Sequence, residues 1–465
     1  MKTGWLLPAL WLAGCTVGPN YETPPQESPG TWGEKVESGP ADLEHWWTVF
    51  QDPELDRLVD AAVTSNHDLR IAEARLREAR AQLGVAAGAL APQVDATFSA
   101  SQLRQSANGL FPVPPGTSPY TTDFQGGFDA SWEIDVFGGL RRAVEAAGAD
   151  LEATVQDRNA VLVSLLGEVA RNYIQVRGAQ RQRSVVRGNV RAAKDTVDLT
   201  KARLAAGVAT ALDLARAEAQ LAAVTAQVPG VERSLKESVH RLGVLVGRDP
   251  GALQAQLEPE AAIPVPPERL LAGIPSDLLK RRPDVRRAER ALAAATARIG
   301  VAEAELYPKF TILGSFGNDS LEWSDFLKWP SRTWSVGPSV RWPLFAGGRL
   351  RANVAVQNAR QEQALAAFEK AFLVALEEVE NALVAYFRER ERHGSLDEAV
   401  AADRRAVALA EDLQRKGLVT FLDVLDAQRT LYAAESLLAE SDAAISINLV
   451  ALYKALGGGW NPDVK

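Results

Sequence analysis

The sequence predicts an α+β membrane protein in which two pairs of β-strands contribute to a membrane-spanning sheet and very long helices form most of the remainder. Three observations lead to this fold class. The chain repeats itself once, each half contains two segments in which apolar and polar residues alternate strictly, and each half contains a very long stretch without proline. Alternation with a period of two is typical of strands, and a long proline-free stretch permits an uninterrupted helix.

Composition and charge limit the possible functions. Of the 465 residues, 46% are hydrophobic and 24% are charged, which is typical of a folded chain of two or three domains. The net charge of -8 argues against a phosphate-binding surface, so we expect no nucleic-acid partner. The four histidines are scattered, and we find no Gly-x-Ser-x-Gly sequence, no Gly-rich phosphate loop and no paired His ligands. The sequence therefore predicts neither an enzyme nor a metal site nor a bound cofactor.

The N-terminus has the pattern of a lipoprotein signal. Lys2 precedes a short apolar segment, Gly4 to Trp11, and the small-residue sequence Leu12-Ala13-Gly14 stands directly before Cys15, the only cysteine. This pattern predicts that a signal peptide, residues 1–14, is removed and that Cys15 receives acyl chains that anchor the protein in membrane lipid. An ordinary export signal with an incidental cysteine is the alternative.

The remainder of the chain is an internal duplication. Asp68-Leu69-Arg70 recurs as Asp284-Val285-Arg286, at an offset of 284 − 68 = 216 residues. Near the end of each half, Gly207 recurs as Gly417 at an offset of 417 − 207 = 210, so the offset drifts by only a few residues. We therefore divide the mature chain into four parts. They are a lipidated N-terminal segment (15–60), a first repeat (61–249), a Pro-rich linker (250–275) and a second repeat (276–460).

Each repeat contains a pair of predicted strands. They lie at about 92–104 and 121–137 in the first repeat and at about 307–318 and 331–345 in the second. Their alternating apolar residues would all lie on one face of a sheet. This apolar set is Val94, Ala96, Phe98, Ala100, Phe124, Phe128, Ala130, Trp132, Ile134, Val136, Phe310, Ile312, Phe316, Trp334, Val336, Val340, Trp342 and Leu344. Strands of about ten residues can cross a tilted bilayer, although a soluble β-sandwich would show the same alternation.

The strands are the only segments that can span a membrane. After the N-terminal signal the sequence has no apolar run of about eighteen residues, which excludes a spanning helix. Four strands cannot close a barrel, and an open edge in lipid would leave backbone groups unsatisfied at a cost of several kcal/mol each. The barrel must therefore be shared between subunits. The loops within the strand pairs, around 111–116 and 318–330, are expected to lie outside the cell.

Two very long helices are predicted, from about Gly139 to Ala206 and from about Gly348 to Lys416. At a rise of about 1.5 Å per residue, each spans about 100 Å. Apolar residues at spacings of three, four and seven predict coiled-coil packing along them and along the last helix. These residues are Leu151, Val155, Leu162, Leu166, Val169, Tyr173 and Val176 in the first repeat and Leu422, Leu425, Leu431, Ala434 and Leu438 in the second.

Particular residues mark the ends of these helices. Each long helix is followed by a glycine–threonine turn, Gly207-Val208-Ala209-Thr210 and Gly417-Leu418-Val419-Thr420. Glycine adopts the left-handed conformation that ends a helix, and threonine caps the next one. A plain helix–helix turn explains these residues fully, and a docking tip is the functional alternative. The segment Arg281-Arg282-Pro283-Asp284 is predicted to begin another helix, with the proline in its first turn and the aspartate near its positive end.

Three motifs, in order, resemble the TolC-like outer-membrane factors and in particular their lipoprotein branch, often labelled NodT. The motifs are Cys15-Thr-Val-Gly-Pro-Asn-Tyr21, then Leu279-Lys280-Arg281-Arg282-Pro283-Asp284-Val285 with Ala288-Glu289 and Ile299-Gly300, then Leu456-Gly457-Gly458-Gly459-Trp460. The resemblance covers nearly the whole mature chain, from Cys15 to Trp460. Thr16, rather than an aspartate, follows the cysteine, which resembles the outer-membrane sorting state of lipoproteins in two-membrane bacteria.

The resemblance implies a homotrimer whose three protomers form a twelve-stranded β-barrel continued by a long α-helical barrel. It implies an outer-membrane channel subunit of a tripartite efflux pump, lipid-anchored in the cell outer membrane and projecting into the periplasm. The partners would be a periplasmic adaptor protein and an inner-membrane pump of the resistance-nodulation-division class. The channel would passively export drugs, other toxic compounds or metal ions. A type I secretion channel is the alternative. A periplasmic adaptor or structural coiled-coil lipoprotein fits less well, because it would lack the duplicated strand pair.

The resemblance also implies two sites at the periplasmic end. An apolar ring and an acidic ring that narrow the closed channel correspond by position to Leu422 and Asp426, with Asp423 as the neighbouring alternative. Arg415 and Arg429 are the candidate partners that hold the aperture shut. Three carboxylates around a threefold axis repel one another and attract cations, whereas a solvated helix face is the alternative interpretation of both aspartates. The residues that fall where relatives contact adaptor hairpins are Gly207, Val208, Thr210, Gly417, Leu418 and Thr420.

Overall fold

The computed structural model describes residues 16–26, 29–34, 37–38, 42–110, 112–114, 116–266, 271–272 and 281–461. The chain divides into two compact units. The strand unit comprises Met1–Pro25, Arg75–Thr154 and Arg287–Phe368, and the helix unit comprises Gln26–Ala74, Val155–Arg286 and Glu369–Lys465. Each unit therefore draws on both halves of the duplicated sequence.

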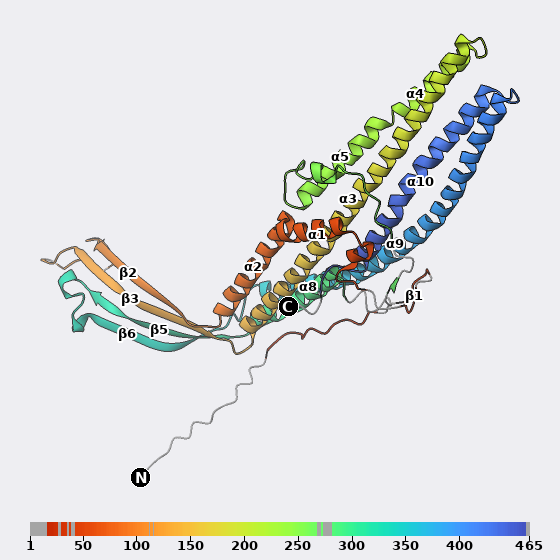
Figure 1. The fold of residues 1–465 in the computed structure, drawn as a ribbon. Coiled ribbons are helices and arrows are strands. Elements are labelled where there is room, and N and C mark those ends of the chain that lie inside the picture. Colours follow the sequence, from red (N-terminus) through yellow and green to blue (C-terminus); the bar gives the residue numbers. More distant parts are fainter. Residues whose placement is uncertain are drawn as a thin grey trace. The chain divides into compact units, whose positions relative to one another are not determined.

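The strand unit contains one four-stranded antiparallel sheet in the order β2-β3-β5-β6. Its strands are β2 (Gln93–Arg104), β3 (Tyr120–Ile134), β5 (Lys309–Ser320) and β6 (Arg332–Arg341), and Figure 1 shows the β2–β3 pair beside the β5–β6 pair. The two pairs meet through β3 and β5, where Phe128 lies opposite Phe316. The predicted fold class, four strands in one sheet joined to very long helices, is confirmed.

The register of the sheet places on one face the members of the apolar set that lie within the strands, whereas Val136, Trp342 and Leu344 lie beyond the strand ends. One row across the four strands consists of Ala96, Phe128, Phe316 and Trp334, and another consists of Val94, Ala130, Gly314 and Val336. The row between them consists of Asp95, Asp129, Ser315 and Ser335. Because successive side chains of a strand point to opposite faces, the sheet has one apolar and one polar face.

The strands differ from the predicted ranges mainly at their ends. β3 ends at Ile134 rather than near 137, and β6 ends at Arg341 rather than near 345. Pro343 has no backbone N–H to donate to a neighbouring strand, which explains the early end of β6. β5 continues to Ser320, so the loop before β6 begins later than predicted. This loop contains the short 3-10 helices η2 (Trp323–Asp325) and η3 (Trp329–Ser331).

Glycines in the middle of the sheet permit a close approach of two strands. Gly127 on β3 pairs with Gly317 on β5, and a Cβ atom built on Gly127 would lie 2.5 Å from the carbonyl oxygen of Phe316. A Cβ atom on Gly317 would lie 2.5 Å from the carbonyl oxygen of Gly126. Glycine at such positions is typical of a sharply bent sheet, and closure into a barrel requires this curvature.

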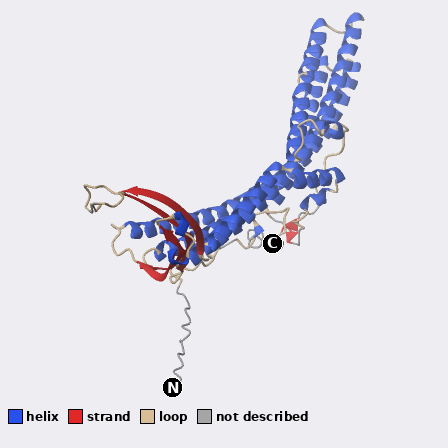
Figure 2. Ribbon diagram, turned by 90° about the vertical axis from the view of Figure 1, so that its left-hand side faces the viewer, coloured by secondary structure: helices blue, strands red, loops and turns tan. Residues whose placement is uncertain are grey.

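Two 67-residue helices follow the strand pairs, α3 (Gly139–Ala205) and α9 (Arg349–Arg415). Figures 1 and 2 show that each turns back into a second helix, so that the chain forms two helical hairpins. The returning helices are α4 (Ala211–Thr225) with α5 (Val228–Leu245), and α10 (Phe421–Ala455). The strand pairs are preceded by α2 (His67–Gly88) and α8 (Pro283–Ala304). None of the helices among the described residues combines the length and hydropathy needed to cross a membrane.

The returning helices of the two hairpins differ. α10 continues unbroken for 35 residues, whereas the first hairpin is interrupted at Ala226 and Gln227, between α4 and α5. Pro229 lies in the first turn of α5. Backbone N–H groups in the first turn of a helix have no partner within the helix, so a proline there removes no hydrogen bond. The interruption therefore lies before Pro229, and α5 begins normally around the proline.

The core of the helix unit is formed by α1 (Pro53–Ser65), η1 (Trp46–Phe50), α6 (Gln254–Leu257) and the described hairpin helices. The predicted packing residues Leu162, Leu166, Val169, Tyr173, Val176, Leu425 and Ala434 are buried. Leu422 is 49% exposed within one chain, so it does not belong to the core of the helix unit. The buried face of α10 near its start consists instead of Val424, Leu425 and Gln428. A short parallel pair, β1 (Glu37–Ser38) and β4 (Leu271–Ala272), also belongs to this unit.

Candidate functional site

The apolar face of the sheet carries large exposed side chains in every strand. Phe98, Phe128, Phe316, Trp334 and Val336 are between 56% and 73% exposed. Soluble monomers rarely expose a continuous apolar surface of this kind, whereas the outside of a transmembrane barrel consists of one. This face has the composition of a surface in contact with lipid.

Two tryptophans occupy equivalent positions at the end of the sheet that leads into the helices. The indole Nε1 of Trp132 donates to the carbonyl oxygen of Leu90 at 2.9 Å, and the indole Nε1 of Trp342 donates to that of Leu306 at 3.1 Å. Both acceptors precede the first strand of their pair. Tryptophans with a satisfied N–H and an exposed ring are typical of the boundary between lipid and water.

The opposite face of the sheet is polar and acidic. Asp95 on β2 lies opposite Asp129 on β3, and Thr97 donates to Asp129 at 3.1 Å. Asp123, Glu133 and Asp319 lie on the same face by register. Carboxylates that line a water-filled lumen attract cations, so this face is suited to the inner wall of an aqueous channel.

The segment that follows the predicted lipidation site is held in the strand unit by Arg142. This arginine is 3% exposed, and its guanidinium donates to the carbonyl oxygens of Val17 and Gly18, both at 3.1 Å, and to the side chain of Asn20 at 2.8 Å. Gly18 has a φ of +88°, and a Cβ atom there would lie 2.4 Å from the Cα atom of Gly300. Two of the sequence motifs, the one after Cys15 and the Ile-Gly pair of α8, are therefore in direct contact.

Cys15 itself lies outside the described residues. Its neighbour Thr16 packs on Gly138, where a Cβ atom would lie 2.7 Å from the threonine Cγ2, and Val17 donates to the carbonyl oxygen of Phe137 at 3.0 Å. These contacts place the described start of the chain at the junction of β3 and α3. The role of Arg142 was not predicted from the sequence, because the carbonyl oxygens of Val17 and Gly18 that it binds lie more than a hundred residues away in the chain.

The second and third motifs meet in the helix unit. Arg282 is 6% exposed, pairs with Asp284 at 2.7 Å and with Glu378 at 2.6 Å, and donates to the carbonyl oxygen of Ala455 at 2.8 Å. The guanidinium of Arg286 lies 5.5 Å from the ring centre of Trp460. Pro283 begins α8 with Asp284 in its first turn, as the sequence predicted, but Arg282 also binds the end of α10, which it did not predict.

The two glycine–threonine turns have the same geometry. Gly207 and Gly417 have φ values of +76° and +74°. Val208 N–H donates to the carbonyl oxygen of Arg203, and Leu418 N–H to that of Leu413, both at 2.9 Å, which are the bonds of a helix ended by a left-handed glycine. Thr210 N–H donates to Asp213 at 3.0 Å, and Thr420 N–H to Asp423 at 2.8 Å. Each threonine therefore caps the returning helix in partnership with an aspartate three residues later.

The apolar side chains at these turns are exposed to solvent in a single chain. Val208 and Leu212 at the first turn are 75% and 57% exposed, and Leu418 and Leu422 at the second are 69% and 49% exposed. The turn itself requires only the glycine, the threonine and the capping aspartate. Exposed apolar groups on such a rigid turn therefore form a surface available for a partner.

The candidate gate residues lie on either side of the second turn, with Arg415 at the end of α9 and the others in the first turns of α10. Asp423 is committed to the cap, and the hydrogen bonds from Thr420 hold its pKa below the usual value. Asp426 is exposed and pairs with Arg429 one turn later, at 2.5 Å. Arg415 pairs with Asp412 at 3.4 Å within the chain, so only one of the two candidate arginines contacts the candidate carboxylate.

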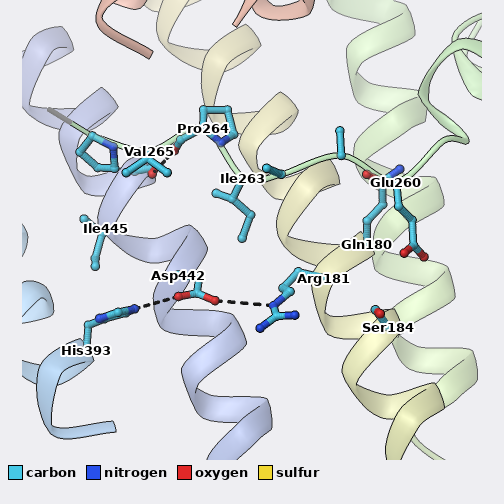
Figure 3. Close-up of a pocket in the computed structure, with 14 residues that line it drawn as sticks. Gln180, Arg181, Ser184, Glu260, Ile263, Pro264, Val265, His393, Asp442 and Ile445 are labelled. Carbon is cyan, nitrogen blue, oxygen red and sulfur yellow. Dashed lines mark hydrogen bonds and ion pairs between the residues drawn. The ribbon is translucent and has the colours of Figure 1, made fainter. Parts of the chain in front are cut away.

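Figure 3 shows a cavity of about 670 Å³ in the helix unit. Asp442 lies between His393, whose Nε2 atom is 2.8 Å away, and Arg181, at 3.8 Å, and the extended segment that includes Pro264 covers the cavity. These groups bind one another, and the cavity contains no nucleophile beside a base of the kind that catalysis requires. Within the described part of the chain, no group of three or more His, Cys, Asp or Glu side chains is arranged to hold a metal ion.

A sheet with one lipid-compatible face, joined to long helical hairpins, defines a membrane channel subunit of the outer-membrane type. The model of the family described as outer membrane efflux protein matches residues 58–248 and 274–458. The chain belongs to this family, and the two matched segments correspond closely to the two repeats. It is therefore an outer-membrane efflux channel protein.

Known relatives match over almost the whole chain. The pyoverdine export outer membrane protein OpmQ of Pseudomonas aeruginosa is 36% identical over 435 residues, which cover 92% of this chain and 90% of that protein. Nodulation protein T of Rhizobium leguminosarum bv. trifolii is 31% identical over 459 residues, which cover 98% and 97%. The solved structure of the outer-membrane channel OprN has a TM-score of 0.87 at 36% identity and covers 96% of this chain and 100% of that one. The predicted family and the outer-membrane location are confirmed.

Proposed function

We propose that three copies of this chain form a lipid-anchored channel that is the outer-membrane component of a tripartite efflux pump. The observation that carries the proposal is the open four-stranded sheet with a lipid-compatible face. Its edge strands β2 and β6 have unpaired backbone groups on one side, and leaving these in lipid costs several kcal/mol each. Three such sheets joined edge to edge give a closed barrel with an acidic, aqueous lumen, through which solutes pass without chemistry.

The mass of the purified protein in detergent tests this assembly. Size-exclusion chromatography with light scattering is expected to give three protein chains per particle. A monomer at physiological concentration would contradict the shared barrel. The variant Cys15→Ser is expected to lose incorporation of labelled palmitate and to remain trimeric, which separates anchoring from assembly.

The pump assignment rests on the two turns and on the relatives. The exposed apolar residues at both turns support docking of helical hairpins from a periplasmic adaptor, which would connect the channel to an inner-membrane pump of the resistance-nodulation-division class. The relatives include a protein named for pyoverdine export, which favours export of small molecules over type I secretion of proteins. The substrates would be drugs, other toxic compounds or metal ions.

Charged substitutions at the turns test the docking site. Val208→Asp and Leu418→Asp change exposed side chains and leave the glycine, threonine and aspartate of each turn intact. The trimer is expected to form normally, whereas co-purification with the adaptor and resistance to the exported compounds are expected to be lost. Normal adaptor binding by both variants would exclude the turns as the docking site.

The gate proposal places an apolar ring at Leu422 and an acidic ring at Asp426. Both residues are exposed within one chain, so both are free to face the axis of a trimer. The capping role of Asp423 supports the choice of Asp426 as the acidic residue. Arg429, already paired with Asp426, and Arg415 would supply the cations that hold neighbouring protomers together at the closed end.

A further inference from the structure

The lipid-facing side of the sheet changes character at one row of residues. On β6 the residues on this side include Trp334, Val336 and Val340, which are apolar and more than half exposed, and Pro338, which is also exposed. The next residue on this side toward the β5–β6 loop is Arg332, which lies opposite Asn318. A cation on the outside of a barrel is strongly destabilising at the bilayer midplane and tolerated near the interface. The Arg332 row therefore marks the outer edge of the apolar band.

The β5–β6 loop folds back over this edge. Phe326 is only 8% exposed, and its ring centre lies 5.9 Å from that of Phe98 and 5.5 Å from that of Trp323. Phe98 points to the apolar face of the sheet, as does Gly126, where a Cβ atom would lie 3.0 Å from the Phe326 ring. The loop therefore lies on the lipid-facing side of the sheet, not on its polar side.

Most of the side chains that this loop leaves exposed are apolar, aromatic or basic, and Glu322 and Ser324 are exposed beside them. Leu327 and Trp329 are 78% and 75% exposed. The guanidinium of Arg332 lies 4.0 Å from the ring centre of Trp329, which is a favourable cation–π geometry. Lys328 pairs with Asp325, but Arg332 forms no ion pair with any residue that the structure describes. Exposed tryptophan beside a basic residue is typical of the headgroup level of a membrane.

We propose that Leu327, Trp329 and Arg332 form a binding site, the rim site, for a phosphate-bearing glycolipid of the outer leaflet. The planar guanidinium of Arg332 donates two hydrogen bonds to the phosphate along one edge. Its face lies over the Trp329 ring, which holds the guanidinium in position. Leu327 contacts the upper part of an acyl chain. The rim site follows from the sheet and its loop alone, so it does not depend on the adaptor, the pump or the gate.

Lipid titration of the purified full-length protein in detergent tests the rim site. Diphosphoryl lipid A and enzymatically dephosphorylated lipid A are added in turn, and bound lipids are counted by native mass spectrometry. The wild-type protein is expected to bind the diphosphoryl form about tenfold more tightly, and Arg332→Gln is expected to remove this preference. Arg341→Gln is the matched control, because Arg341 lies on the same strand but at its other end and on its polar face.

Three results would overturn the proposal. They are equal binding of the two lipids by the wild-type protein, an equal loss of the preference in both arginine variants, and binding of phosphatidylglycerol at least as tight as that of diphosphoryl lipid A. The last result would assign the contact to phospholipids in general. The comparison of lipids on the wild-type protein remains decisive even where Arg332→Gln fails to fold.

Discussion

In both repeats, the residue before the first helix donates a hydrogen bond to the last residue of the final helix, but the donor group differs. In the first, the side chain of Asn66 donates to the carbonyl oxygen of Leu245 at 2.9 Å, near the end of α5. In the second, the guanidinium of Arg282 donates to the carbonyl oxygen of Ala455 at 2.8 Å, at the end of α10. The donors are 282 − 66 = 216 residues apart and the acceptors 455 − 245 = 210, so the contact is part of the duplicated unit.

The neutral and the charged donor impose different requirements on their surroundings. Asn66 satisfies itself locally, because its side-chain oxygen also accepts from Leu69 N–H at 3.0 Å. Arg282 is a buried cation and requires the carboxylates of Asp284 and Glu378. Burial lowers the pKa of Arg282, but the two carboxylates raise it by more, so the charged form is maintained. The second repeat is therefore held together through three elements, α8, α9 and α10, where the first uses two.

The largest expected effect on stability comes from loss of the contacts of Arg282. Arg282→Met removes both ion pairs and the bond to Ala455, and we expect a loss of about 3 kcal/mol in stability. Asn66→Ala removes one buried hydrogen bond and one cap, and we expect about 1–2 kcal/mol. Thermal dissociation of the detergent-solubilised oligomer, followed by circular dichroism, measures both.

The order of these two variants is what tests the comparison. The carboxylates of Asp284 and Glu378 are 39% and 51% exposed, so water can solvate them after the arginine is lost. If Asn66→Ala proved as destabilising as Arg282→Met, the charge would contribute nothing beyond its hydrogen bond. Glu378→Gln provides the intermediate case, because it removes one charge and keeps the size of the side chain.

A second difference between the repeats lies just beyond the turns. Asp426 follows the capping Thr420 by six residues, and the residue six after Thr210 is Arg216. The pseudo-equivalent positions thus carry opposite charges on otherwise similar turns. We expect Asp426→Ala to raise the conductance of the closed channel several-fold in planar bilayers, because it removes the proposed acidic ring and the ion pair between Asp426 and Arg429. Arg216→Ala is the matched control, and an equal increase in both variants would remove Asp426 from the gate.

The features that the sequence predicted best are those set by residues close together in the chain. Parity alone assigns Phe128 and Asp129 to opposite faces, so the two faces of the sheet were predictable before its register was known. The glycine turns were predictable for a similar reason, because a left-handed glycine and a capping threonine act within a few residues of each other. Leu422 shows the limit of a periodic pattern, because its spacing matches that of the packing residues and yet it is 49% exposed within one chain.

Contacts between distant segments were not predictable. Arg142 binds backbone carbonyl oxygens, and any residue type in those positions would offer the same acceptor. The packing of Phe326 on Phe98 joins residues of different repeats, and only their apolar character hints at it. The resemblance of whole motifs carried information that local rules lack, since Arg282 and Gly457 belong to separate motifs that meet in space.

The smallest expected effect concerns what the two turns have in common. The hydrogen bonds from Thr210 and Thr420 lower the pKa values of Asp213 and Asp423, so each cap is fully formed above the ordinary aspartate pKa near 4 and is lost as pH falls through the lowered value. Amide hydrogen exchange at the start of α4 and α10, corrected for its intrinsic pH dependence, is expected to be about fivefold faster below that range. Asp423→Asn should abolish this change in α10 and leave it in α4, so that the first turn serves as the internal control for the second. If the Asp423→Asn variant still showed the change in both turns, or showed it in neither, the aspartates would not set the stability of the caps.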